Sequence, residues 1–68
     1  MLKHLTNEEK IVLELLGQGE TLKEIKTKLG ISMYRIIAAR DSAVAKLEAR
    51  NQPHAVYLAM LKGLIDYG

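Results

Sequence analysis

Residues 21–47, TLKEIKTKLGISMYRIIAARDSAVAKL, decide the fold of this chain. Leu22 to Leu29 has the apolar spacing of a short helix, Gly30-Ile31 marks a turn, and Ser32 is an N-cap residue ahead of a longer helical stretch. Two helices joined by so short a turn are typical of a helix-turn-helix. In that unit the second helix enters the major groove of DNA, so the outward residues of this helix determine what the chain binds.

Two further helices are predicted on either side of this motif. Thr6 and Glu9 form a capping-box pattern ahead of the first helix, and Thr21 repeats the pattern ahead of the second. The third helix contains no breaker before residue 51, so it is expected to run to about residue 50. Pro53 suits the first turn of a fourth helix, which ends near Gly63. The sequence therefore predicts a single all-α domain over 1–68, with the motif over about 21–50 and the last helix over about 53–63.

Apolar residues at helical spacing predict the buried sides of the first three helices. These residues are Ile11, Val12, Leu15, Leu16, Leu22, Ile25, Leu29, Ile36, Ala43 and Leu47.

Composition excludes several classes of function. The 68 residues include no cysteine, which removes disulfides and thiolate zinc sites, and the two histidines, His4 and His54, stand far apart. There is no phosphate-cradling glycine loop and no nucleophile beside a base, so neither an enzyme nor a cofactor is expected. The adjacent carboxylates of Glu8-Glu9 diverge on a helix and suit its positive N-terminus. No uncharged run is long enough to cross a bilayer and no signal peptide opens the chain, so we expect a cytoplasmic protein.

Charge is distributed unevenly along the chain. The net charge is only +2, but residues 21–50 contain seven basic residues against three acidic ones, while the first helix is acidic. Such polarity suits one side that faces phosphates. Lysines that only keep helix surfaces soluble would give the same count.

The order of these signals resembles the DNA-binding domain of LuxR/GerE-type regulators over almost the whole chain. The matching elements are Leu5-Thr6 with Glu9, Val12-Leu13, Leu16, Gly19, Lys23-Glu24-Ile25, Leu29-Gly30-Ile31-Ser32, Ile36, Lys46-Leu47, Arg50-Asn51, Ala55-Val56, Ala59 and Gly63-Leu64-Ile65. The centre alone is also similar to region four of sigma factors. The resemblance implies a four-helix domain, dimerisation through the fourth helix, and regulation of transcription by operator binding. Larger members carry an N-terminal sensor domain, so a standalone version is expected here.

The chain departs from the family pattern at several positions. Lys26 stands where a small alanine is usual, and Arg35 stands where threonine is usual. Ile37 and Ala39 replace lysine and histidine of the recognition helix. Glu48 replaces a usual glycine, which favours a longer third helix.

A helical wheel of the third helix predicts the face that would meet DNA. Its outward arc contains Met33, Tyr34, Ile37, Ala38 and Asp41. None of these is an arginine, lysine, asparagine or glutamine, the usual readers of guanine and adenine. Thymine-methyl contacts, a phosphate bond from the tyrosine hydroxyl and cytosine N4 bound to the aspartate remain available.

Contacts to the DNA backbone are predicted from the caps and cations around this helix. The expected residues are Thr21, Lys23, Ser32, Arg35 and Lys46. Two other interpretations also explain the apolar arc of the third helix. Met33, Tyr34 and Ile37 can form a protein-binding surface, with a regulator or sigma factor as the antagonised partner. The same residues can also simply pack against a neighbouring segment or a second copy of the chain.

The fourth helix is apolar on two sides and therefore predicts a homodimer. Its second apolar side contains Tyr57, Met60, Leu61 and Leu64. A two-fold dimer presents two recognition helices about one DNA turn or a small multiple apart, which predicts a roughly palindromic site. The alternative is that the tail Ile65-Asp66-Tyr67 folds back over this side.

Overall fold

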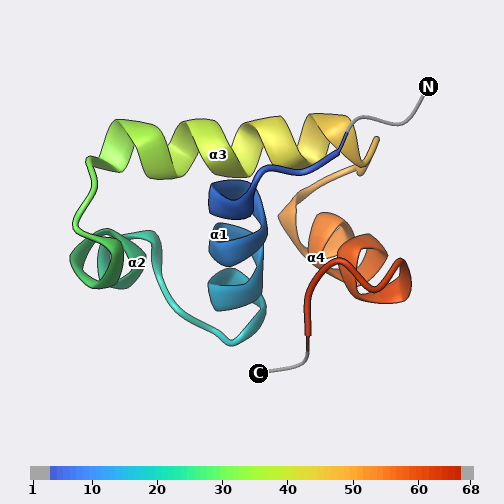
Figure 1. The fold of residues 1–68 in the computed structure, drawn as a ribbon, viewed down its shortest axis with the longest axis horizontal. Helices are drawn as coiled ribbons and strands as arrows, with labels where there is room; N and C mark the ends of the chain where they lie inside the picture. Colours follow the sequence, from blue (N-terminus) through green and yellow to red (C-terminus); the bar gives the residue numbers. More distant parts are fainter. Residues whose placement is uncertain (1–3, 67–68) are drawn as a thin grey trace.

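Four helices account for the secondary structure of residues 4–66, the part of the chain that the computed structural model describes (Figure 1). They are α1 (Asn7–Gly17), α2 (Leu22–Leu29), α3 (Met33–Lys46) and α4 (Gln52–Leu61). The predicted all-α, four-helix fold is confirmed.

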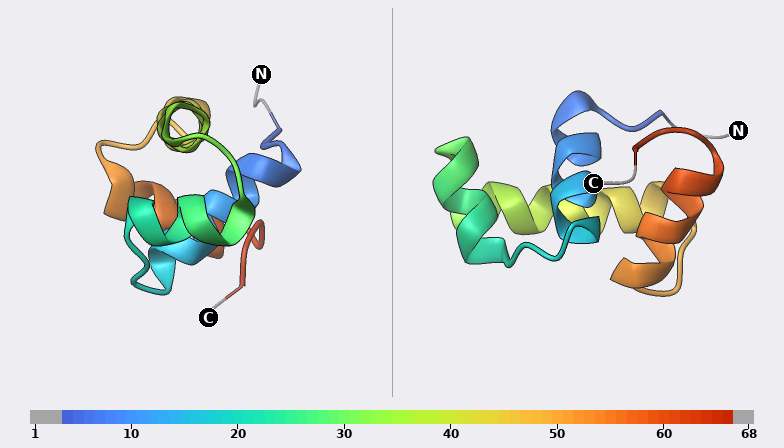
Figure 2. Two further views of the ribbon diagram at one scale, coloured as in Figure 1. Left: turned by 90° about the vertical axis from the view of Figure 1, so that its left-hand side faces the viewer. Right: turned by 90° about the horizontal axis from the view of Figure 1, so that it is seen from below.

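Helix α1 occupies the centre of the molecule and contacts each of the other three helices. Helix α3 crosses one end of α1, while α2 and α4 lie near opposite ends of α3 (Figures 1 and 2). Helix α3 is the longest of the four helices and lies at the surface of a domain that measures 32 × 22 × 19 Å.

The core is divided into two clusters, one on each side of α1. Val12 belongs to the cluster shared with α2 and the start of α3, whereas its neighbour Leu13 belongs to the cluster shared with α4 and the end of α3. Helix α3 spans both clusters because Ile36 lies in the first and Ala43 in the second. The sequence analysis missed Leu13, and it wrongly placed Ile11, which is exposed, on the buried side.

The predicted capping boxes of α1 and α2 are both formed. The Thr6 hydroxyl accepts the Glu9 N–H at 3.1 Å while the Glu9 carboxylate accepts the Thr6 N–H at 2.8 Å. Thr21 and Glu24 repeat this geometry with the same distances. Reciprocal bonds of this kind satisfy backbone N–H groups that the helix itself leaves without a partner.

Helix α3 ends at Lys46, about one turn earlier than expected, because Glu48 adopts a left-handed conformation with φ of 55°. The Glu48 N–H donates to the Ala45 carbonyl and the Ala49 N–H donates to the Val44 carbonyl. This is the Schellman pattern that usually needs glycine. The glycines after α1 and α4, Gly19 and Gly63, occupy the corresponding left-handed positions in those helices. The expected extension of α3 was therefore wrong: the turn forms although glycine is absent.

The residues after α4, up to Asp66, fold back onto the domain. Ile65 is buried in the cluster that contains Leu13, and the Asp66 N–H donates to the Glu14 carboxylate at 3.2 Å. Tyr67, the last residue of the predicted tail, lies outside the described residues. Met60 and Leu64 also pack against this cluster, so they serve the core of their own chain.

Candidate nucleic-acid interface

Helix α3 is fixed to the core along one side and free along the other. Ile36, Ala39 and Ala43 are buried, whereas Tyr34 is 81% exposed and Ala38 is also exposed. The predicted outward arc is exposed only in part. Met33 and Ile37 are half-buried, and Met33 packs against the core cluster that contains Ile25.

The first turn of α3 contains no acidic residue of its own. The Ser32 hydroxyl caps it by accepting the Arg35 N–H at 3.2 Å. At the N-terminus of α2, by contrast, the Glu24 carboxylate is already bound to Thr21, whose backbone N–H lowers the pKa of that carboxyl. An anion at α2 would have to compete with Glu24, while the positive end of α3 is open to one.

Arg35 forms an exposed ion pair with Glu8 at the start of α1. This pair brings together residues far apart in the sequence and places an acidic group beside a predicted phosphate contact. Because both side chains remain partly exposed, a phosphate can exchange with Glu8 at little cost.

Lys46 does not point its ammonium group toward open solvent. Its Nζ donates to the Glu9 carboxylate at 2.9 Å and to the His4 carbonyl at 3.2 Å. The Lys46 side chain is 21% exposed and that of Glu9 only 8%. Lys46 therefore links α3 to α1, and its ammonium group is occupied at the position where a phosphate contact was predicted.

The Glu9 carboxylate stays ionised although it is buried. Burial raises the pKa of its carboxyl. Hydrogen bonds from Ser42, Lys46 and Thr6, together with the charge of the lysine, outweigh burial and hold the pKa below the ordinary value of 4.5. A buried carboxylate with this many donors makes the α1–α3 contact depend on charge as well as on apolar packing.

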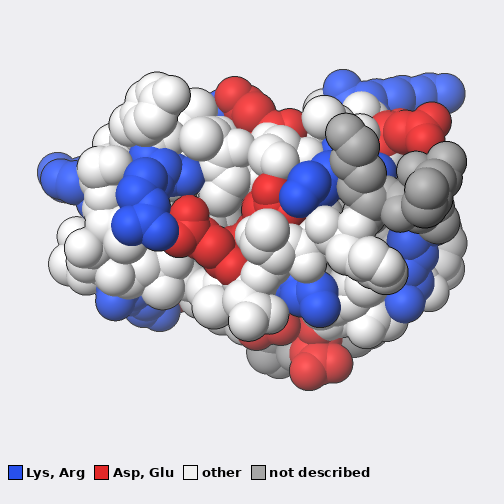
Figure 3. Space-filling view, turned by 45° about the horizontal axis from the view of Figure 1, so that its top comes forward, with Lys and Arg blue, Asp and Glu red and all other residues white. Residues whose placement is uncertain are grey.

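Basic and acidic side chains alternate on the face that carries α3, where no continuous basic stripe is visible (Figure 3). Two more pairs, Lys28 with Glu20 and Arg40 with Asp41, add to the two already described. Among residues 4–66, no ion pair is found for Lys23, Lys26 or Arg50. These three exposed cations, on α2 and in the α3–α4 connection, are the positive charges that the motif leaves for phosphates.

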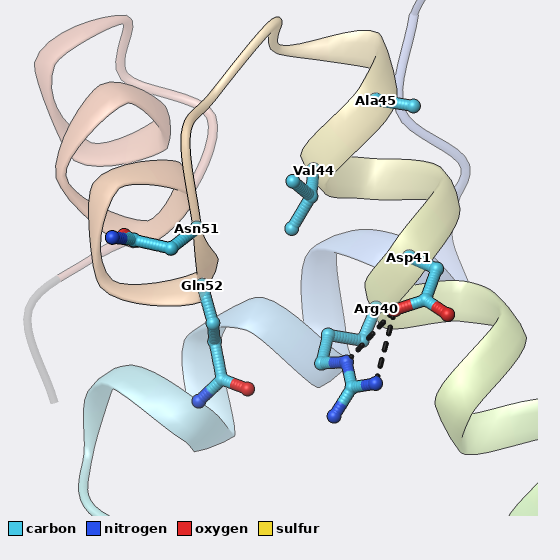
Figure 4. Close-up of a pocket in the computed structure, with 6 residues that line it drawn as sticks. All are labelled: Arg40, Asp41, Val44, Ala45, Asn51 and Gln52. Atoms are coloured by element: carbon cyan, nitrogen blue, oxygen red, sulfur yellow. Dashed lines mark hydrogen bonds and ion pairs between the residues drawn. The ribbon is translucent and has the colours of Figure 1, made fainter.

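A shallow groove of about 460 Å³ lies between the second half of α3 and the start of α4 (Figure 4). Its lining residues are Arg40, Asp41, Val44, Ala45, Asn51 and Gln52. The Asn51 side chain caps α4 by accepting the His54 N–H, and the His54 ring accepts the Arg50 N–H. His54 thus belongs to the helix cap, and the groove has a fixed wall on its α4 side.

Sequence reasoning missed Glu8, Glu9 and Arg40 as parts of this surface. Glu9 and Lys46 are 37 residues apart, and Glu8 and Arg35 are 27 apart, so no local spacing reveals either contact. The Arg40–Asp41 pair could have been predicted from the sequence, because Arg40 directly precedes the one acidic residue of α3.

The second apolar side of α4 is divided by the structure. Tyr57 and Leu61, one turn apart, are 59% and 68% exposed. Met60 and Leu64, as described, are covered by their own chain. An exposed apolar surface therefore remains on α4, but it is narrower than the sequence predicted.

The sequence profile of the LuxR family of bacterial regulatory proteins matches residues 3–59. The chain belongs to this family, and its helix-turn-helix domain is that of a DNA-binding transcription regulator. No curated protein matches the chain.

No helix within residues 4–66 is long and apolar enough to cross a membrane. No group of three or more His, Asp or Glu side chains in this range is arranged to hold a metal ion.

Proposed function

We propose that this protein binds duplex DNA as a homodimer and regulates transcription from a roughly palindromic site. The observation that carries the proposal is the geometry of α3. One side of this helix is fixed by Ile36 and Ala43, while the opposite side carries exposed residues along its length and its first turn contains no acidic residue. A rigid helix with an open, positive N-terminus is suited to enter a major groove.

Most of the affinity is assigned to phosphates. Lys23 and Lys26 on α2 and Arg50 after α3 form the phosphate-binding set, with the N-cap regions at Thr21 and Ser32 beside them. Arg35 joins this set only where it leaves Glu8. Lys46 is left out because its ammonium group is bound to Glu9. Base contacts fall to Tyr34, Ile37, Ala38 and Asp41, with Met33 at the margin. Contacts of the first kind position a protein on DNA, and contacts of the second kind give sequence preference.

The dimer is assigned to the exposed part of α4. Tyr57 and Leu61 form the centre of this surface. Met60 and Leu64, which pack against the core, lie at its margin. A two-fold axis through this surface would set the two copies of α3 side by side on one face of the duplex.

A salt titration of binding to random-sequence duplex DNA tests the proposal. If three free cations per protomer each displace a counterion, a dimer should show a slope of log K against log salt of about −5. Glu8→Gln should tighten binding and steepen the slope, because Arg35 is then free for phosphate. Glu48→Gln, which removes an exposed carboxylate that has no ion pair among residues 4–66, controls for the loss of one negative charge. Absence of binding at about 50 mM salt would refute DNA binding.

One observation favours a second function, in which the motif binds and antagonises another protein. Among residues 4–66, Tyr34 is the most exposed of the large apolar side chains, and aromatic residues are enriched in protein interfaces. Under this alternative, binding resists salt and is lost on Tyr34→Ala or Ile37→Asp. If the motif binds DNA instead, Tyr34→Ala changes the affinity for DNA only slightly.

A further inference from the structure

Asp41 is the only acidic residue of α3, and it lies on the exposed side of the helix with 65% of its side chain accessible. A carboxylate in this place faces the phosphates of any DNA that α3 enters. An acceptor-only, negative group there is repelled unless its charge is neutralised and one of its oxygens finds a donor on the DNA.

Arg40 supplies that neutralisation. Its Nε and one terminal nitrogen each lie 3.0 Å from the same oxygen, Oδ1, of Asp41. The Arg40 side chain is only 27% exposed and lines the groove beside α4, whereas Asp41 lies at the groove's outer rim (Figure 4). Because both donors meet on Oδ1, the second oxygen, Oδ2, receives no hydrogen bond from residues 4–66.

We propose that Arg40 and Asp41 act as one reading unit, in which Oδ2 of Asp41 accepts a hydrogen bond from the N4 amino group of a cytosine in the major groove. Arg40 is the positioning residue: it fixes the carboxylate and cancels its charge. This inference rests on the proposed DNA binding and names the base that the α3 surface selects.

The choice of cytosine follows from the hydrogen-bonding groups of the four bases. Guanine and thymine present acceptors in the major groove, which repel a carboxylate. Adenine presents its N6 donor next to the N7 acceptor, so a carboxylate gains one contact and is repelled by the other. Cytosine presents the N4 donor and has no acceptor of its own on this edge, and it is therefore the base that an ionised aspartate prefers.

The neighbours of Asp41 allow the close approach that its short side chain requires. Ala38 lies three residues before it and Ala45 four residues after it, which places all three on one face of the helix. Both alanines are exposed and neither extends beyond its Cβ. The backbone of α3 can therefore come near the base edges at this position, whereas larger neighbours would hold the carboxylate too far away.

Selection of binding sites from a random duplex library, at one low salt concentration, tests the inference. The wild-type protein should prefer cytosine about five- to tenfold at one position of each half-site, as expected for a single base contact. Asp41→Ala should abolish the preference at that position alone. Arg40→Ala, and Arg40→Lys, which keeps the charge but not the paired donors, should weaken it several-fold. Asp66→Ala removes an exposed aspartate of the tail and should leave the preferences unchanged.

The possible failures are distinct. If the wild type and Asp41→Ala select the same sites, the reading unit is refuted while DNA binding stands. If adenine replaces cytosine at the Asp41-dependent position, the assignment of the base is wrong. If the wild type binds no duplex at any salt concentration, the proposed function fails and this inference fails with it.

Discussion

Replacing Lys46 with methionine should destabilise the fold, although this lysine lies at the surface of a basic motif. The change removes an ammonium group that donates to the Glu9 carboxylate at 2.9 Å, and it keeps most of the apolar stem. The carboxylate, which is 8% exposed, then loses its only cationic partner among the described residues.

The size of the effect can be worked from the burial of the two groups. Breaking a fully buried ion pair costs about 3–5 kcal/mol. Here Lys46 keeps about a fifth of its exposure, and Glu9 retains hydrogen bonds from Thr6 and Ser42, so a loss of about 2 kcal/mol is expected. For a domain of this size that corresponds to a fall in Tm of about 8–16 °C.

Urea denaturation at pH 7 measures this loss against a matched control. Lys26→Met removes an exposed lysine for which no ion pair is found among residues 4–66, and it should change the free energy of unfolding by less than about 0.5 kcal/mol. Adding Glu9→Gln to the Lys46 variant removes the unpaired charge and should recover part of the loss. Equal denaturation midpoints for the two methionine variants would refute the reasoning.

The same comparison predicts a pH dependence with a definite sign. The pKa of the Glu9 carboxyl is lower in the folded protein than the ordinary value of 4.5. The ionised Glu9 carboxylate therefore stabilises the fold fully at pH values above 4.5. This stabilisation is lost as the pH falls through the folded-state pKa. The difference in stability between the wild type and Lys46→Met should therefore be constant near neutrality and shrink below about pH 4.5. A difference that persists in acid would mean that apolar packing of the lysine stem, rather than the ion pair, is responsible.

Three further outcomes are expected from the packing of the helices. Glu48→Gly should raise the free energy of unfolding by about 1 kcal/mol in urea denaturation, because φ of 55° strains any residue with a Cβ. Gly17→Ala should destabilise by about 1 kcal/mol, since the new Cβ would lie 2.9 Å from a methyl of Val56, and it should become favourable once Val56→Ala is also made. Leu61→Glu should shift the protein from dimer to monomer in sedimentation while its circular dichroism is unchanged, because Leu61 is exposed in the single chain. A loss of helicity would instead assign Leu61 to the fold.

The parts of the fold that sequence could predict are those set by neighbouring residues. Capping boxes, helix-ending glycines and the buried sides of α2 and α3 depend on spacings of three to eight residues, and they were confirmed. The end of α3 was missed because Glu48 adopts a glycine-like conformation that its residue type does not favour. The split core around α1 was missed because Val12 and Leu13 are adjacent, and helical periodicity assigns adjacent residues to one broad apolar face.

The candidate interface was harder to predict because its charges are compensated at long range. Four of the seven basic residues counted over 21–50 form ion pairs, and two of these four, Arg35 and Lys46, are bound by the adjacent carboxylates at the start of α1. Those carboxylates looked like ordinary first-turn residues in the sequence. A count of charges along the motif therefore overstates what phosphates can use.

The compensation has a consequence for specificity. Non-specific binding rises with every cation that meets a phosphate, whereas base contacts give the preference for one site. By binding Arg35 to Glu8 and Lys46 to Glu9, helix α1 lowers the non-specific attraction to phosphates. It does not affect the base contacts proposed for the outward side of α3. A small regulator with few base contacts gains discrimination from such a restriction, because weak attraction to random DNA increases the relative weight of each contact it does make. Under the proposed function, the acidic first turn of α1 therefore contributes to site discrimination by limiting attraction to phosphates.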